Sequence, residues 1–157
     1  MSEAGLLLTI FLMFIGAAPG STGGGFKITS TAVILKALYS YITKKRSVNM
    51  LGSRIDDADL LKTFVTIAMF LLLLTFFSLL LCAHGIPVVN AVYECTSALS
   101  TVVLSTGITS SLSWDNKLVL IFLMFIGRVG SLSIFLAASK LSEAEKIQNP
   151  KAKLMIG

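Results

Sequence analysis

Residues 87–109 decide the fold of this chain, and they read PVVNAVYECTSALSTVVLSTGIT. Proline is favoured at the first position of a helix, so Pro87 predicts a helix that continues from Val88 to about Leu99, a length of about 18 Å. That length is roughly half the thickness of a bilayer. Residues 100–109 are rich in β-branched and hydroxyl side chains, which favour extended chain. The stretch therefore predicts a short helix followed by an extended return.

Two long apolar segments flank this stretch. The first, from Phe64 to Cys82, contains nineteen residues without a charge, and as a helix it spans about 28 Å, close to the hydrocarbon thickness. The second runs from Leu118 to about Ser139 and is interrupted only by Arg128. Irregular backbone at membrane depth is tolerated only inside protein or beside a watery cavity. The order of the segments therefore predicts a pore loop between two membrane-spanning helices.

The composition is typical of a membrane protein. The chain has 157 residues, of which 55% are hydrophobic and 13% are charged, and its mean hydropathy is +0.86. A soluble domain carries about a quarter charged residues. The composition excludes a disordered tail, a basic nucleic-acid arm and a typical cytosolic enzyme. The sequence shows no motif for enzyme chemistry, for a cofactor or for a resident metal.

The basic residues predict an orientation. Six of the 13 lysines and arginines lie in residues 36–62 and four lie after residue 139, whereas residues 83–117 contain only Lys117. Cytoplasmic loops carry the excess of lysine and arginine. We therefore expect residues 44–62 and the C-terminal tail in the cytoplasm and residues 83–117 on the outer side. The N-terminus then begins outside, as expected for the C-terminal piece of something longer.

The hexapeptide Phe-Leu-Met-Phe-Ile-Gly occurs at residues 11–16 and again at 122–127, 111 residues apart. Each copy falls in the outer half of a predicted helix that runs inward. The chain is therefore predicted to hold the closing helix of one repeat unit and then one complete unit. After the shared glycine, the first copy continues into a glycine-rich tract at 19–25 and the second into Arg128. Two different features at the same depth below a pore loop predict a gate.

Four motifs resemble the Ktr/Trk/HKT superfamily of potassium transporters, closest to the C-terminal part of its KtrB-type translocating subunits. They are MFIGAAPGSTGGGFK at 13–27, SALSTVVLSTGIT at 97–109, MFIGRVG at 124–130 and KLMIG at 153–157. The resemblance covers nearly the whole chain. It implies an all-α membrane protein in which one chain carries four helix–pore-loop–helix, potassium-channel-like units around a single potassium pore.

The resemblance also divides the chain into segments. Residues 1–43 match the second helix of repeat unit three, broken by a gate loop at 19–25. Residues 44–60 are expected to form a cytoplasmic linker, and residues 140–157 a cytoplasmic C-terminal tail. Repeat unit four, residues 61–139, is expected to contain a helix at 61–83, a pore helix at 87–99, a filter segment at 100–107 and a helix at 117–139.

The filter segment is implied to bind potassium through backbone carbonyls that replace its water; the alternative is a mere connector. The family's filter strand reads Thr-Val-Gly-Leu, so Val103 stands here at the glycine position. Glycine reaches positive φ easily, whereas valine strongly disfavours it. Two interpretations stay open, a distorted quarter of the filter or a sequence that has drifted. The implied selectivity-filter residues are Ser100, Thr101, Val102, Val103 and Leu104.

The glycine-rich tract matches the family's gate loop; the alternative is a helix kink that packs small residues. Arg128 at mid-membrane costs about 2.5–3.5 kcal/mol unless it faces a polar cavity. We interpret it as a cavity-facing positive barrier that also bonds gate-loop carbonyls. The alternative is a purely structural ion pair, for which Glu94 is one candidate partner. The implied gate-loop residues are Gly20, Ser21, Thr22, Gly23, Gly24 and Gly25.

The remaining polar residues predict structural roles. Cys82 and Cys95 lie in apolar surroundings and are interpreted as small hydrophobic residues. His84 is expected to be exposed at a helix end. Asp57 or Asp59 is expected to cap the helix that follows them.

The sequence as a whole predicts a multi-pass protein of the cell membrane, with a cytoplasmic C-terminus. Its predicted function is potassium uptake, as part of the ion-translocating subunit of a Ktr/Trk-type cation transporter. The resemblance implies K⁺ as the transported ion, with sodium coupling left open and no cofactor. It implies as partners the lipid bilayer, the missing N-terminal units or other copies, a homodimer mate and a cytosolic nucleotide-binding regulatory subunit, but no nucleic acid. The alternative is a non-conducting membrane interaction protein, a truncated remnant of that transporter.

Overall fold

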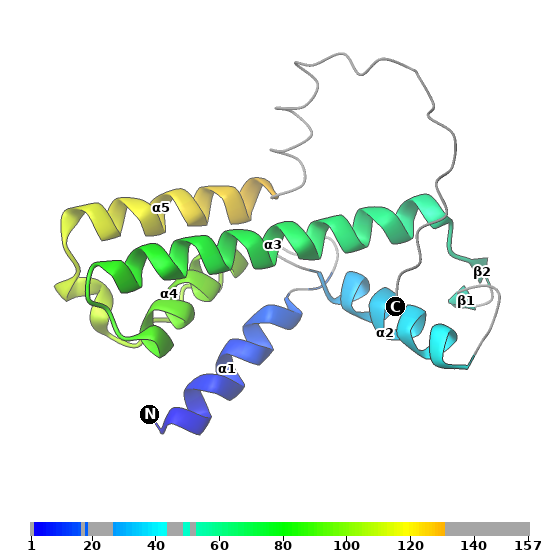
Figure 1. Ribbon diagram of the computed structural model, residues 1–157, viewed down its shortest axis with the longest axis horizontal. Helices are drawn as coiled ribbons and strands as arrows, with labels where there is room; N and C mark the ends of the chain where they lie inside the picture. Colours follow the sequence, from blue (N-terminus) through cyan, green and yellow to red (C-terminus); the bar gives the residue numbers. More distant parts are fainter. Residues whose placement is uncertain (1, 17, 19–26, 44–48, 51–52, 131–157) are drawn as a thin grey trace, which may run out of the picture.

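A computed structural model describes residues 2–16, 18, 27–43, 49–50 and 53–130, arranged as Figure 1 shows. Apart from one antiparallel hairpin of two-residue strands, in which Asn49 pairs with Arg54, the regular structure in this part is helical, as the expected all-α class requires. In chain order the elements are α1 (Glu3–Ile15), α2 (Ile28–Ile42), β1 (Asn49–Met50), β2 (Ser53–Arg54), α3 (Asp57–Ala83), α4 (Val88–Ser100), the 3₁₀ helix η1 (Ile108–Ser111) and α5 (Trp114–Val129).

The long helix α3 is the framework of the molecule. Within the described ranges, it is the helix that is both long and apolar enough to cross a membrane, over Ala58–Ala83. It begins four residues before the expected start at 61, because the extended backbone of Asp56 already provides the N-cap. The expected capping by Asp57 or Asp59 is wrong. Asp59 instead accepts a hydrogen bond from Lys62 Nζ at 3.1 Å.

A glycine turn ends α3 and reverses the chain. The Gly85 N–H donates to the Cys82 carbonyl at 2.9 Å and the Ile86 N–H to the Leu81 carbonyl at 3.4 Å, a Schellman motif. This motif needs a left-handed residue, and Gly85 has φ 85°. Pro87 then forms the N-cap of α4.

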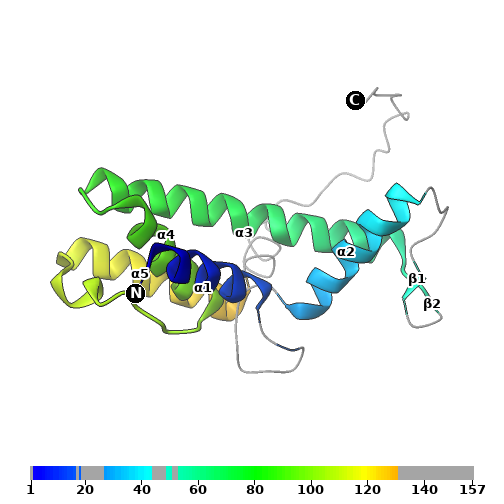
Figure 2. The same ribbon diagram turned by 90° about the horizontal axis from the view of Figure 1, so that it is seen from below.

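Helix α4 is the centre of the packing. It contacts α1, α3 and α5, and both views place it among these three helices (Figures 1 and 2). Nine of its 13 residues are buried, although its length of about 20 Å would not cross a bilayer. The residues that form its core with α3 and α5 include Leu81, Ala91, Cys95, Leu99 and Leu123.

The chain between α3 and α5 leaves the C-terminal end of α3 and returns to a position beside that same end. His84 Nδ1, just after α3, lies 2.6 Å from Asn116 Oδ1 in the first turn of α5, although 32 residues separate them. His84 is exposed, as expected, whereas Asn116 is buried. The segment from α4 through η1 is therefore a loop that begins and ends beside the same end of α3 (Figure 1).

Helix α5 differs from the expected helix at 117–139. It begins at Trp114, because the extended backbone of Ser113 provides the N-cap. It ends at Val129, because Gly130, with φ 92°, leaves the helical conformation. Residues 131–139 of the expected helix lie outside the described residues.

The N-terminal region is interrupted where a broken helix was expected. α1 ends at Ile15, followed by Gly16 with φ 74°, and α2 begins after Lys27. Figure 1 shows α1 beside α4 and α2 beside the first half of α3. The expected gate loop at 19–25 lies outside the described residues.

Candidate functional site

The C-terminal end of α4 and the extended segment after it form the candidate site. Ser100 is the last residue of α4 and is buried. The Thr101 N–H donates to the Ala98 carbonyl and the Val102 N–H to the Ser97 carbonyl, both at 3.1 Å, which is again the Schellman pattern. Thr101, with φ 53°, takes the left-handed position that glycine usually occupies. The helix is thus stopped at the first of the expected filter residues.

Val103 also adopts a left-handed conformation. Its φ is 64°, and among the described non-glycine residues only Thr101 shares a positive φ. Val102 between them is not among the residues with positive φ, so the sign of φ alternates over these three positions. The side chains of Val102, Val103 and Leu104 are exposed. Val103 therefore has a backbone conformation that glycine would adopt easily. For valine this conformation is strained.

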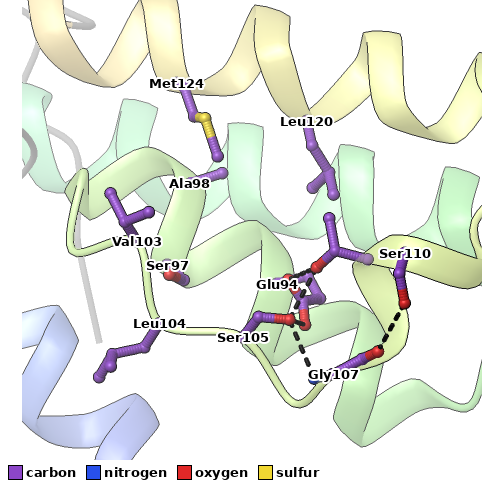
Figure 3. Close-up of a pocket in the computed structure, with 11 residues that line it drawn as sticks. Glu94, Ser97, Ala98, Val103, Leu104, Ser105, Gly107, Ser110, Leu120 and Met124 are labelled. Carbon is purple, nitrogen blue, oxygen red and sulfur yellow. Dashed lines mark hydrogen bonds between the residues drawn. The ribbon is translucent and has the colours of Figure 1, made fainter.

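The carboxylate of Glu94 binds the return segment to α4. Glu94 Oε1 accepts hydrogen bonds from Ser105 Oγ at 2.7 Å, from the Thr106 N–H at 2.9 Å and from Thr106 Oγ1 at 3.0 Å. Glu94 Oε2 accepts from Thr109 Oγ1 at 3.0 Å. Figure 3 shows this side chain directed from α4 at the segment that follows Leu104. An ionised carboxylate is acceptor-only and offers about four lone-pair sites, which suits these four donors.

Sequence reasoning missed this role of Glu94, which was considered only as an ion-pair partner of Arg128. Glu94 is not that partner, since no ion pair joins these two described residues. The overlooked signal is a single acidic residue inside an apolar helix, followed 11–15 residues later by the hydroxyl residues of Ser-Thr-Gly-Ile-Thr. A buried carboxylate requires hydrogen-bond partners, and no base lies near it in the sequence.

Gly127 lets α5 approach the end of α4. A Cβ atom at this position would lie 2.1 Å from the Leu99 carbonyl oxygen and 2.8 Å from its carbon. Leu99 is two residues before Thr101, so the contact with α5 supports the backbone that leads into the candidate filter. Glycine at position 127 is therefore a packing requirement of the site.

A cavity of about 360 Å³ lies between the return segment, α4 and α5. Figure 3 shows its lining, in which Glu94, Ser105 and Ser110 are among the polar residues at one end. The rest of its wall is largely apolar, with Ala98, Val103, Leu104, Leu120 and Met124. No group of three or more histidine, cysteine, aspartate or glutamate residues in the described part of the chain is arranged to hold a metal.

Of the expected gating residues, only Arg128 lies in the described part of the chain. Arg128 is exposed in the last turn of α5, where its charge complements the negative end of the helix dipole. Its expected partners are the carbonyls of Gly20, Ser21, Thr22, Gly23, Gly24 and Gly25, which lie outside the described residues.

Comparison with known proteins assigns the chain to a family. The family model described as "Cation transport protein", TrkH, matches residues 1–149. The chain belongs to the TrkH family of cation transport proteins. The resemblance to potassium transporters found in the sequence is thereby confirmed.

Individual relatives of this TrkH-family chain are transporters. "Ktr system potassium uptake protein D" of Bacillus subtilis is 36% identical, over all of this chain and 35% of the relative. "Potassium/sodium uptake protein NtpJ" of Enterococcus hirae is 35% identical, over all of this chain and 36% of the relative. "Ktr system potassium uptake protein B" of Vibrio alginolyticus is 31% identical, over 99% of this chain and 34% of the relative. The chain thus spans about a third of the length of these relatives, and its family places it in a membrane.

Replacing Val103 by glycine in this TrkH-family chain is expected to stabilise it slightly. The change removes about 1–2 kcal/mol of left-handed strain from the folded state. It costs about 0.5–1 kcal/mol, because glycine gives the unfolded chain more conformational entropy. Val102→Gly, one residue earlier, has no such strain to relieve and should lower the unfolding temperature. Thermal unfolding of the detergent-purified proteins checks this pair. Equal destabilisation by both changes would mean that Val103 is not held at positive φ.

Proposed function

We propose that this chain forms one quarter of the ion path of a potassium-uptake protein of the cell membrane, with residues 88–107 as a pore loop. The observation that carries the proposal is the alternating sign of φ at Thr101, Val102 and Val103, directly after the buried helix α4. Alternating φ signs allow successive carbonyl oxygens to face one side, as a row of ligands for a dehydrated cation requires. Ser100 to Leu104 provide these carbonyls.

The electrostatics of the loop favour a cation. Helix α4 directs its C-terminal, partly negative end at Thr101, which contributes up to about 1 kcal/mol in favour of a positive charge. The Glu94 carboxylate is buried close to the return segment and adds a negative charge behind it. K⁺ is the proposed transported ion. Coupling of its transport to Na⁺ is proposed as an alternative, because the Enterococcus relative is named a potassium/sodium uptake protein.

The proposed gate is the glycine-rich tract at 20–25, between α1 and α2. The tract contains three consecutive glycines, Gly23 to Gly25, and glycine has no Cβ atom to restrict its backbone. Arg128 follows the matching hexapeptide in α5 and is proposed as a positive barrier at the same depth. A cation that passes must then displace the loop and approach a fixed positive charge.

The chain spans only about a third of the length of its relatives, so we propose that other segments or subunits complete the pore. The further pore-loop units come from additional sequence or from other copies, and the complete protein is proposed to form a homodimer. A cytosolic nucleotide-binding subunit is proposed to contact residues 44–62, which include the hairpin of β1 and β2 (Figure 1), and the C-terminal tail.

The test is growth of a potassium-uptake-deficient bacterium at low K⁺. This chain is expressed together with the part of the Bacillus subtilis relative that it does not match, which we propose to be the N-terminal two thirds. We expect growth and rubidium uptake with the pair and neither with one part alone. Absence of uptake from the pair, when both parts reach the membrane, would support the non-conducting alternative instead.

The same assay tests the gate. Arg128→Ala should raise the rate of uptake, because a positive barrier is removed, and deletion of Gly23 to Gly25 should change it. Leu118→Ala, at an exposed position of the same helix, is the matched control and should leave uptake unchanged. Uptake that is unchanged or slower with Arg128→Ala contradicts the barrier.

A further inference from the structure

The cluster around Glu94 contains more close oxygen contacts than it has hydroxyl hydrogens. Besides their bonds to Glu94, Ser105 Oγ and Thr109 Oγ1 lie 2.7 Å from each other. With the bond from Thr106 Oγ1, four side-chain oxygen–oxygen contacts of 2.7–3.0 Å are present. Each hydroxyl group has a single hydrogen to donate. Three hydroxyl groups therefore supply three hydrogens for four contacts, and one hydrogen is missing.

An ionised Glu94 does not supply the missing hydrogen, because a carboxylate only accepts. If Ser105 and Thr109 both donate to Glu94, the 2.7 Å contact between their own oxygens contains no hydrogen. If one of them donates to the other, a carboxylate oxygen loses a donor instead. The Gly107 N–H donates to Ser105 Oγ at 3.0 Å and so adds no hydrogen between the two hydroxyl oxygens. The cluster therefore has a place for one more proton.

No counter-charge holds Glu94 in its ionised form. Glu94 is 5% exposed, and in the described part of the chain its hydrogen bonds come from hydroxyl groups and one N–H, none of them from a titratable group. A buried charge without a counter-charge is costly, and a bound proton removes that cost. The titratable groups on α4 and on the elements packed around it are Tyr93 and Cys95 of α4, Glu3 of α1, Asp57, Asp59, Lys62 and Cys82 of α3, His84 after it, and Asp115, Lys117 and Arg128 of α5.

The cavity beside the return segment gives a proton access to Glu94. Glu94 and Ser105 both line this cavity, as Figure 3 shows, and the Ser105 side is exposed. The segment then leads through η1 into the first turn of α5, at the end of the molecule that is expected to face outward. Acid in the outer medium is therefore the source of the proton.

We propose that Glu94, Ser105 and Thr109 form a binding site for a proton taken from the outer medium. On acidification a hydronium ion gives its proton to Glu94 Oε2 and leaves as water. Glu94 Oε2 then donates to Thr109 Oγ1, Thr109 Oγ1 donates to Ser105 Oγ, and Ser105 Oγ donates to Glu94 Oε1. Each contact of this ring now contains one hydrogen, and Thr106 donates to Oε1 as before.

The bound proton also removes the negative charge behind the candidate filter. The six residues from Glu94 to Ser100 cover about 9 Å of helix. At the effective dielectric constant of proteins, a unit charge at that distance changes the affinity for a monovalent cation on the order of tenfold. Half-maximal rubidium uptake should therefore need about tenfold more rubidium in acid than at neutral pH. This consequence rests on the proposed function, whereas the proton site itself does not.

Infrared spectroscopy of the detergent-purified full chain tests the proton site directly. At about pH 5.5 exposed carboxylates are still largely ionised, so the C=O stretching band of a protonated carboxyl group should come from Glu94 and should disappear at about pH 8. Glu94→Gln should lack this band at both pH values, because its amide group already carries hydrogens into the ring. Asp115→Asn, which removes an exposed carboxyl group of α5, is the matched control and should keep the band.

Rubidium uptake by this chain together with the rest of the Bacillus subtilis relative is the second readout. Glu94→Gln should need the higher rubidium concentration at both pH values, whereas the wild type should need it only in acid. His84→Gln should follow the wild type in both assays. This control is needed because histidine also changes its charge in this pH range.

Absence of the band at about pH 5.5, or an equal band in Glu94→Gln, would overturn the proton site. So would an effect of sodium at neutral pH that replaces the effect of acid in the wild type but not in Glu94→Gln, because the site would then hold a metal ion. The band without uptake at either pH contradicts the proposed function alone. Uptake without the band contradicts the proton site alone.

Discussion

Replacing Glu94 by alanine is expected to destabilise the protein by about 3 kcal/mol, because hydrogen bonds to a charged group contribute about 1.5–3 kcal/mol each and some of the freed donors regain water. Four donors on Ser105, Thr106 and Thr109 lose their acceptor together. The measurements are thermal unfolding in detergent and amide hydrogen exchange at Thr106. The Thr106 N–H, which bonds Oε1 directly, should lose its protection. In the uptake assay, discrimination between K⁺ and Na⁺ should fall, since the return segment no longer has a fixed position.

Two further variants separate this role from general packing. Glu94→Gln keeps one acceptor oxygen, so it should retain most of the protection at Thr106 and lose about 1 kcal/mol of stability. Thr96→Val is the matched control on α4, because the fully buried Thr96 hydroxyl bonds only the Val92 carbonyl of its own helix in the described contacts. It should leave the exchange at Thr106 unchanged. If Glu94→Ala and Thr96→Val behaved alike at Thr106, Glu94 would not position the return segment.

Replacing Gly127 by alanine is expected to cost about 3 kcal/mol or more, at the upper end of the effects of overpacking. The added Cβ would lie 2.1 Å from the Leu99 carbonyl oxygen, and a backbone atom cannot rotate out of the way as a side chain can. Either α5 moves outward or the end of α4 shifts. A shift of α4 moves Thr101 as well, so loss of ion discrimination should accompany the lower unfolding temperature.

Gly107→Ala is the matched control for Gly127→Ala. A Cβ atom at Gly107 would meet nothing within 4 Å, so only the left-handed backbone, with φ 95°, opposes the change. That strain is worth about 1–2 kcal/mol. The unfolding temperature of Gly127→Ala should therefore be clearly lower than that of Gly107→Ala. Equal unfolding temperatures for the two variants would contradict the close approach of α5 to Leu99.

Local signals were sufficient to anticipate most helix positions. The expected short helix at 87–99 lies one residue from the observed α4, because Pro87 marks its start in the sequence. The expected end at 83 is that of α3, where Gly85 supplies the left-handed turn. The starts of α3 and α5 were placed too late, because the extended residues Asp56 and Ser113 cap these helices with little apolar character around them.

The site was anticipated less completely. The resemblance to the family led us to expect a filter segment at residues 100–107, and valine at the family's glycine position raised the question of its conformation. The structure gives Val103 the left-handed φ regardless. Valine by itself opposes that conformation, so the surrounding contacts must impose it, and no propensity of the residue could have indicated it.

The sequence by itself determined the membrane character of this protein and the short helix after Pro87. It also determined the family of cation transporters to which its motifs point. All three depend on runs of neighbouring residues. Only the tertiary structure decided which residues meet. Glu94 binds residues 11–15 positions away, Gly127 touches Leu99, and of the matching leucines in two identical hexapeptides Leu12 is exposed and Leu123 is buried. Such contacts depend on how separate helices pack against one another, and a local stretch of sequence carries no record of the neighbour that it will meet.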